Sequence, residues 1–328
     1  MRKGFFLLSM CLAAVFFLQC QRKNPDGYYL EDKYPKIELR SGDLQLTLFK
    51  PDAKNGYYRG TRYDWGNQIA QISYKGHTFI TEWPDDHDPL NPDHGIGILN
   101  EFNRELALFP YEQGKSGFGV RPGIGQIQYQ DVEEPKVIEP ARWEMSNGQT
   151  WAIVENSLVY GKDSGYFYGK RIRLLPPNTV EIQSILENVG RTLLTSDLNC
   201  TFRFNIDHQP IDSNLILRLA KEIPVIEDST ETWQLLSNDF LLKRPVQKKE
   251  TVETVAYQSS DRSIKVIFQL ENPQAGIGVQ VHNTLPAQKL EILGNDRVLG
   301  PHSAHRFEVK TGDALEWRTV LTFYEVRQ

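Results

Sequence analysis

Apolar and polar residues alternate with a period of two along most of this chain. The alternation covers residues 37–48, on both sides of Ser41-Gly42-Asp43, and it recurs at residues 180–184, 264–270, 277–281 and 315–323. A period of two is typical of strands that bury one face. The sequence therefore predicts a hairpin at residues 37–48 and a strand in each of the later segments.

Turn-forming residues separate these predicted strands at short intervals. They are Asn147-Gly148, Pro176-Pro177-Asn178, Asn188-Val189-Gly190, Gly294-Asn295-Asp296 and Thr311-Gly312-Asp313. Helical periodicity is weak, and only residues 213–223 leave a choice between helix and strand. Many short strands at this spacing indicate an all-β sandwich or barrel. We expect one domain at residues 37–328, because no composition shift and no fixed-period repeat marks a boundary.

The first residues differ from the rest of the chain. Met1-Arg2-Lys3 precedes an apolar run at residues 5–18, and this order is typical of an export signal peptide. The run is shorter than the roughly 20 residues that a membrane-spanning helix needs. We therefore expect residues 1–19 to be a signal peptide and the protein to be exported to the cell envelope.

The segment Phe17-Leu18-Gln19-Cys20 resembles a bacterial lipobox, in which the cysteine is lipidated and becomes the new amino terminus. Gln19 and Phe17 depart from the usual residues, so ordinary cleavage and an uncleaved anchor are the alternatives. With Cys20 lipidated, the polar residues 20–36 form a tether to a membrane, on the periplasmic side or at the cell surface. Cys200 is then the only other cysteine, and no intrachain disulfide is expected.

Composition narrows the classes of partner. The chain is 40% hydrophobic, which supports a substantial core, and its formal net charge is -5, which argues against nucleic acid as a partner. Nucleophile motifs of the Gly-x-Ser-x-Gly type and dinucleotide-binding fingerprints are absent from the sequence, so we expect no cofactor. Asp85-Asp86-His87-Asp88 and Asp93-His94 crowd metal-binding residue types together. Their spacing fits no zinc pattern, and a solvated acidic loop is the expectation.

One segment carries a specific family resemblance. Residues 56–66, Gly-Tyr-Tyr-Arg-Gly-Thr-Arg-Tyr-Asp-Trp-Gly, resemble an early signature of the aldose 1-epimerase, or galactose mutarotase-like, superfamily. Residues 94–102 are similar to a glycine-rich segment ending in Glu-Phe that the family places at its cleft, and residues 117–125 to the strand after it. The resemblance extends more loosely to residue 325. It implies a large antiparallel β-sandwich of the galactose mutarotase-like (supersandwich) type and a sugar or oligosaccharide ligand.

The resemblance also implies substrate-binding residues. Arg62 is expected to face the substrate, because a guanidinium offers several donors in fixed geometry to vicinal hydroxyls. The alternative is an ion pair with Asp64 that fastens the loop. His94, Glu101 and Trp65 are the other substrate-binding candidates. Aromatic side chains that stack on a sugar face, or belong to the core instead, are Tyr57, Tyr58, Trp65 and Trp83.

Interconverting the anomers of a sugar needs a base for the proton on O1 and an acid for the ring oxygen. The family implies a His acid in mid-chain and a Glu base near the end, and both positions differ here. Asn199-Cys200-Thr201-Phe202 carries Cys200 where the acid is expected, and Pro301-His302 carries His302 where the base is expected. The catalytic candidates are therefore His302 and, as a relocated acid, His208. Cys200 is expected to be a small buried side chain.

Two functional hypotheses follow from the resemblance. The first is an aldose 1-epimerase-like isomerase that acts on the anomeric centre of an aldose, and it predicts a cleft in which four residues converge: Arg62, Glu101, His208 and His302. The alternative is a non-catalytic carbohydrate-binding lipoprotein that has lost the acid/base pair. Lyase or hydrolase chemistry on the same fold is a third hypothesis, and hydrolysis would need two carboxylates across the cleft.

Overall fold

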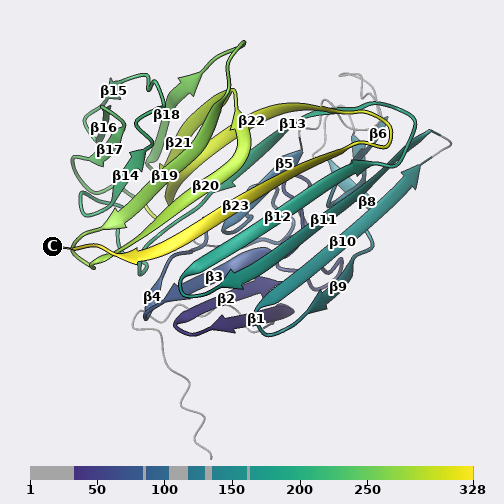
Figure 1. The fold of residues 1–328 in the computed structure, drawn as a ribbon, viewed down its shortest axis with the longest axis horizontal. Helices are drawn as coiled ribbons and strands as arrows, with labels where there is room; N and C mark the ends of the chain where they lie inside the picture. The colour runs from purple at the N-terminus through teal and green to yellow at the C-terminus, as the bar shows by residue number, and fades with distance from the viewer. Residues whose placement is uncertain (1–32, 84–85, 103–116, 130–134, 161–162, 328) are drawn as a thin grey trace, which may run out of the picture. The chain divides into compact units, whose positions relative to one another are not determined.

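Every regular element in the described part of the chain is a β-strand (Figure 1). The computed structural model describes residues 33–83, 86–102, 117–129, 135–160 and 163–327, and these fall in one compact unit. The predicted signal peptide, the predicted lipidation site Cys20 and most of the predicted tether lie outside the described residues. Across those described ranges, no helix has the length and apolarity that a membrane crossing requires.

The strands pair in antiparallel fashion and form four sheets. The largest has 11 strands, in the spatial order β15 (Asp228–Ser229), β16 (Trp233–Leu236), β17 (Asp239–Leu242), β14 (Ile216–Leu219), β19 (Ile264–Asn272), β20 (Ile277–Ala287), β23 (Ala314–Glu325), β12 (Thr179–Asn188), β11 (Ser164–Leu175), β10 (Trp151–Tyr160) and β9 (Glu144–Asn147). The five-stranded sheet has the order β18 (Thr251–Gln258), β21 (Lys289–Asn295), β22 (Leu299–Val309), β13 (Leu194–Phe202) and β5 (Ile98–Phe102).

Two smaller sheets complete the fold. One has the order β1 (Lys36–Ser41), β2 (Leu44–Phe49), β3 (Gln68–Tyr74) and β4 (His77–Thr78), and the other has the order β6 (Gly117–Arg121), β7 (Gly125–Tyr129) and β8 (Lys136–Pro140). The predicted hairpin at residues 37–48 is β1 and β2. Ser41 pairs with Leu44, and Gly42 has a φ of 59°, a backbone conformation that glycine adopts without steric cost.

Aromatic rings join the two larger sheets across the core. Phe102 on β5 meets Tyr168 on β11 edge-on, with ring centroids 5.5 Å apart. Phe202 on β13 meets Phe268 on β19 in the same way, at 5.2 Å. Buried rings of this kind contribute a large share of the hydrophobic stabilisation of a core. The predicted all-β sandwich is confirmed, the later alternating segments are strands β12, β19, β20 and β23, and residues 213–223 contain strand β14 rather than a helix.

A buried ion pair fastens the loop before β3 to both large sheets. Lys170 Nζ on β11 lies 2.9 Å from Asp64 Oδ1 and donates to the Gly66 carbonyl at 2.8 Å. The two charged side chains are only 5% and 1% exposed. The main-chain N–H of Asp64 donates to the carbonyl of Asn100 on β5 at 2.9 Å. The alternative pairing of Asp64 with Arg62 is therefore wrong, and Arg62 is left for other partners.

Lys170→Met is expected to lower the free energy of unfolding by about 3–5 kcal/mol, because it leaves Asp64 as an uncompensated buried charge. Urea denaturation followed by tryptophan fluorescence measures the change. Adding Asp64→Asn removes the stranded charge, and the double variant should recover most of the loss. A single variant within about 0.5 kcal/mol of the original protein, the range of an ordinary surface substitution, would show that the pair has no such role.

Candidate functional site

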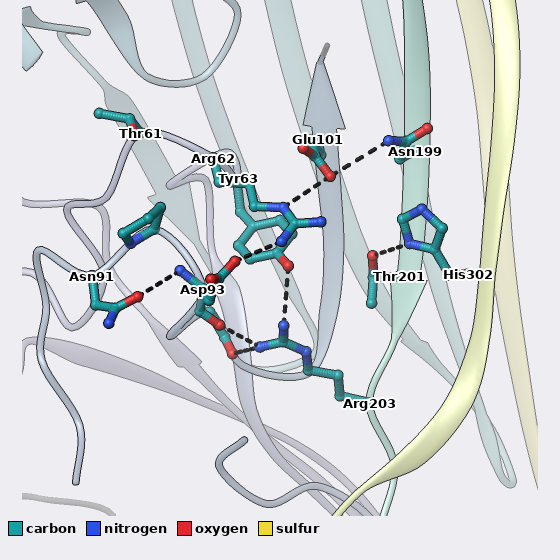
Figure 2. A network of polar contacts seen from close by, with 12 residues as sticks. Thr61, Arg62, Tyr63, Asn91, Asp93, Glu101, Asn199, Thr201, Arg203 and His302 are labelled. Atoms are coloured by element: carbon teal, nitrogen blue, oxygen red, sulfur yellow. Dashed lines mark hydrogen bonds and ion pairs between the residues drawn. The ribbon is translucent and has the colours of Figure 1, made fainter. Parts of the chain in front are cut away.

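One face of β13 supplies side chains to the candidate site. Asn199, Thr201 and, just past the end of the strand, Arg203 are two residues apart and so point to the same side. On the neighbouring strands, Glu101 of β5 lies opposite Asn199, and His302 of β22 lies opposite Thr201. The pairing of three strands therefore gathers these side chains on one surface of the five-stranded sheet (Figure 2).

An open cavity of about 220 Å³ lies over this surface. It is lined by Arg62, Tyr63, Trp83, Asp93, Thr201, Phe202, Arg203, Leu293 and His302. The cavity is smaller than the roughly 300 Å³ and more of a drug-sized site. It combines guanidinium, carboxylate and imidazole groups with an indole ring, which suits a small polar ligand.

Arg62 lies between two carboxylates at the edge of the cavity (Figure 2). Its Nη1 is 2.5 Å from Asp93 Oδ1, and its Nε is 3.1 Å from Glu101 Oε2. Glu101 also accepts a hydrogen bond from the Asn199 side chain at 3.4 Å. These contacts fix the positions of both carboxylates and offset part of their charge.

Arg203 crosses the base of the cavity and is 4% exposed. Its Nη1 donates to the Asp93 carbonyl at 2.9 Å and to the Gly95 carbonyl, and its Nη2 donates to the Tyr63 hydroxyl at 3.0 Å. The guanidinium carbon lies 4.6 Å from the centroid of the Trp83 ring. Arg203 thus holds the segment after Asp93 and one aromatic wall of the cavity against the end of β13.

His302 is a titratable side chain of the cavity lining. It is 8% exposed, and its Nδ1 lies 2.8 Å from the Thr201 hydroxyl oxygen. Burial lowers the pKa of His302 below its ordinary 6.5, although the charges of Glu101 and Glu291 act in the opposite direction. The imidazole is therefore neutral at pH 7. Because Thr201 engages Nδ1, Nε2 is the ring nitrogen that remains for a ligand.

Four of the predicted site residues are not part of the cavity lining. Glu101 is one of them, but it pairs with Arg62 at the edge of the cavity, whereas the other three lie apart. Trp65 is buried and donates from Nε1 to the Gly60 carbonyl at 2.9 Å. His94 accepts at Nδ1 from the main-chain N–H of Asp88 at 2.9 Å. His208 follows Asp207, whose main chain and side chain bond to β4. The structure therefore brings together Arg62, Glu101 and His302, and it does not bring His208, His94 or Trp65 to them.

Cys200 points to the opposite side of β13 from the cavity. It lies between Asn199 and Thr201 in an extended strand, so its side chain faces the interior, where Sγ lies 3.4 Å from Asn100 Oδ1. Burial raises the pKa of the Cys200 thiol to about 12. Cys200 therefore does not occupy the place of an acid in the cavity, and Thr201 is the residue that faces His302. The interpretation of Cys200 as a small buried side chain is confirmed.

Thr201, Asp93 and Arg203 are site residues that the sequence argument missed. Arg203 carries a usable signal, because it is a charged residue between Phe202 and Phe204 and continues the alternation from Thr201. A charge flanked by two core aromatics must find polar partners when the segment is buried. From the sequence, Asp93 is expected only in an acidic loop.

The aromatic and metal-binding candidates have mixed outcomes. Tyr57 and Tyr58 are core residues, whereas Trp83 lines the cavity. His87 stacks on Tyr57 at a centroid distance of 3.7 Å. Within the residues that the structure describes, no group of three or more His, Cys, Asp or Glu side chains is placed to hold a metal ion. Asp85 lies outside those residues.

Comparison with known proteins assigns the fold. No protein-family model and no curated protein matches the sequence. Solved structures, in contrast, match the fold of the chain. A candidate aldose 1-epimerase from Escherichia coli K12 is 12% identical, with a TM-score of 0.51 over 89% of this chain and 99% of that chain. A galactose mutarotase-like protein from Clostridium acetobutylicum is 11% identical, with a TM-score of 0.53 over 89% of this chain and 95% of that chain. A galactose mutarotase related enzyme from Lactobacillus acidophilus is 10% identical, with a TM-score of 0.52 over 89% of this chain and 100% of that chain. The chain thus has the galactose mutarotase-like fold that its motifs led us to expect.

Proposed function

We propose that this protein binds an aldose in the cavity lined by Arg62, Asp93 and His302 and interconverts its anomers, as an aldose 1-epimerase-like isomerase. The observation that carries the proposal is His302, a neutral buried imidazole whose Nδ1 is held by Thr201. A neutral imidazole of this kind accepts a proton near pH 7. The fold shared with proteins described as aldose 1-epimerases and mutarotases supports the proposal by analogy only.

The cavity wall fits a sugar ring. Arg62 offers donors and Asp93 offers an acceptor to neighbouring hydroxyls, and both are fixed by their own ion pair. Trp83 adds an apolar surface for the carbon-bound face of the ring. A ligand placed between these groups and β13 would have its reacting end beside His302.

The reaction needs one proton to move between two oxygens of the same carbon. In the tautomer whose Nδ1–H donates to the Thr201 hydroxyl oxygen, His302 Nε2 takes the proton from O1, the C1–O1 double bond forms, and the C1–O5 bond breaks. The ring oxygen then receives the proton from the imidazolium, because O1 and O5 are both attached to C1. Rotation about C1–C2 and the reverse steps give the other anomer. Arg62 stabilises negative charge that develops on oxygen during ring opening.

The second candidate is carbohydrate binding without turnover. Arg62 pairs with both Asp93 and Glu101, so the two carboxylates beside the cavity are already engaged. If the single imidazole cannot reach both O1 and the ring oxygen, the site would bind the sugar without accelerating the exchange of its anomers. This arrangement is what a binding protein that had lost its acid/base pair would have.

We also propose that the protein works at the cell envelope as a lipoprotein anchored to a membrane through Cys20. The basic and apolar order of residues 1–18 and the lipobox-like segment that ends at Cys20 support this location.

Anomeric exchange of reducing sugars, measured by two-dimensional exchange NMR, is expected to accelerate in the presence of the protein. His302→Gln should lower the acceleration about 10²-fold or more, because it removes the proton acceptor. His305→Gln is the matched control, since His305 lies on the same strand and bonds to the Pro286 carbonyl instead. Sugar contacts without any acceleration by the original protein would favour the binding function. Acceleration that survives His302→Gln would remove His302 from the mechanism.

The pH dependence of the acceleration is expected to follow the lowered pKa of His302. The neutral form is the active one, so the rate should decline as the pH falls, with its inflection below pH 6.5. The uncatalysed exchange rate at each pH is subtracted. An inflection at or above pH 6.5 would show that a group other than the buried imidazole controls the rate.

A further inference from the structure

His302 passes through a charged state in the proposed reaction. When Nε2 takes the proton of O1, the neutral imidazole becomes an imidazolium, and it returns to the neutral form when the proton moves on to the ring oxygen. The His302 side chain is buried, at 8% exposure, and burial makes a charged imidazole costly. Groups that stabilise the imidazolium without reacting themselves would therefore lower the barrier.

Two carboxylates flank His302 on the surface that carries the cavity. Glu291 of β21 lies directly opposite His302 of β22 in the antiparallel register, so the two side chains are neighbours on one face. Glu101 of β5 approaches from the other side, where β13 separates its strand from β22. The negative charges of these carboxylates favour the protonated imidazole, and they act on it more strongly than the positive charges of Arg62 and Lys289.

Each carboxylate has a cation partner, and in both pairs the carboxylate is the more buried member. Glu101 Oε2 lies 3.1 Å from Arg62 Nε, and Glu291 Oε1 lies 2.7 Å from Lys289 Nζ. The two glutamate side chains are 17% and 13% exposed, whereas the side chains of Arg62 and Lys289 are 37% and 38% exposed. Solvent screens the exposed cations better than it screens the carboxylates, so the ion pairs leave negative potential at His302.

A purely structural role explains less of this arrangement. Arg62 is already fixed by Asp93, and the pair of Lys289 with Glu291 lies on a single strand, where it joins no two elements of the fold. The other charged residues of the cavity lining, Asp93 and Arg203, act on each other. What the two glutamates share is their position on either side of the reacting imidazole.

We infer that Glu101 and Glu291 are positioning residues of the proposed reaction, which stabilise the imidazolium of His302 once it has taken the proton of O1. The inference rests on the proposed function and adds a part to its mechanism. Neither carboxylate gives or takes a proton itself. Arg62 stabilises the negative charge that develops on oxygen, and the two glutamates stabilise the positive charge that develops on the imidazole.

Glu101→Gln and Glu291→Gln test the inference, because each removes one charge and keeps the shape of the side chain. Anomeric exchange of freshly dissolved α-D-glucose, α-D-galactose and α-D-xylose is followed by polarimetry at about pH 7.5, where His302 is neutral. kcat and KM are determined for the sugar that the original protein accelerates most. Each variant should lower kcat about tenfold, the change that corresponds to one pKa unit of the imidazole, and should change KM less.

The pH dependence separates this role from a structural one. Removing a negative charge beside an imidazole lowers the pKa of that imidazole, so the inflection of kcat should lie at lower pH in both variants than in the original protein. NMR titration of the histidine ring protons should show the same downward shift for His302 without any sugar. Loss of a merely structural pair would weaken folding or binding and would leave the pKa of His302 where it is.

Glu308→Gln is the matched control. Glu308 is an exposed residue on the same strand and the same face as His302, about 20 Å away at the rise of a strand. It should change neither kcat nor the inflection, because salt screens exposed charges at that distance.

A kcat within about twofold of the original value in both variants would overturn the inference and leave the proposed function standing. A lower kcat without a shift of the inflection would overturn it as well, since the pairs would then be structural. If one variant does not fold, the other decides. An original protein that accelerates none of the three sugars would overturn the proposed function and the inference together.

Discussion

The buried ion pair between Lys170 and Asp64 is the contact on which the geometry of the site depends. It fixes a loop of irregular backbone against β11, while the main-chain N–H of Asp64 bonds to β5. Arg62 and Tyr63 precede Asp64 directly in the sequence, so their positions over the five-stranded sheet follow from this attachment. Such a pair is expensive to bury and contributes position more than stability. Removing either partner therefore threatens the site as well as the fold.

The fold was largely predictable because its signal is local. A period of two in hydrophobicity and short turn sequences are enough to identify strands such as β12 and β23. The site was only partly predictable, because it depends on which face of a strand meets which neighbour. A motif comparison aligned Cys200 with an expected acid, whereas the pleat of β13 turns Cys200 inward and presents Thr201 to His302. The partners of Arg62 and Asp64 are likewise set by contacts between segments distant in sequence.

The distribution of charge divides the cavity into two ends. At one end Arg62 lies between the carboxylates of Asp93 and Glu101, so that negative charge exceeds positive charge there. At the other end Arg203 contributes a positive charge that only carbonyls, a phenol and aromatic rings surround. His302 lies in the lining beside both, neutral because it is buried. A ligand with neighbouring hydroxyls and an anomeric carbon would use the Arg62 end and His302.

A crystal structure of the protein with a reducing aldose bound tests the central claim most directly. If His302 is the proton-transfer group, O1 or the ring oxygen should lie within about 3.2 Å of its Nε2, with Thr201 still on Nδ1. An aldose bound in the cavity with its anomeric carbon turned away from His302, or an aldose bound elsewhere on the chain, would contradict the account.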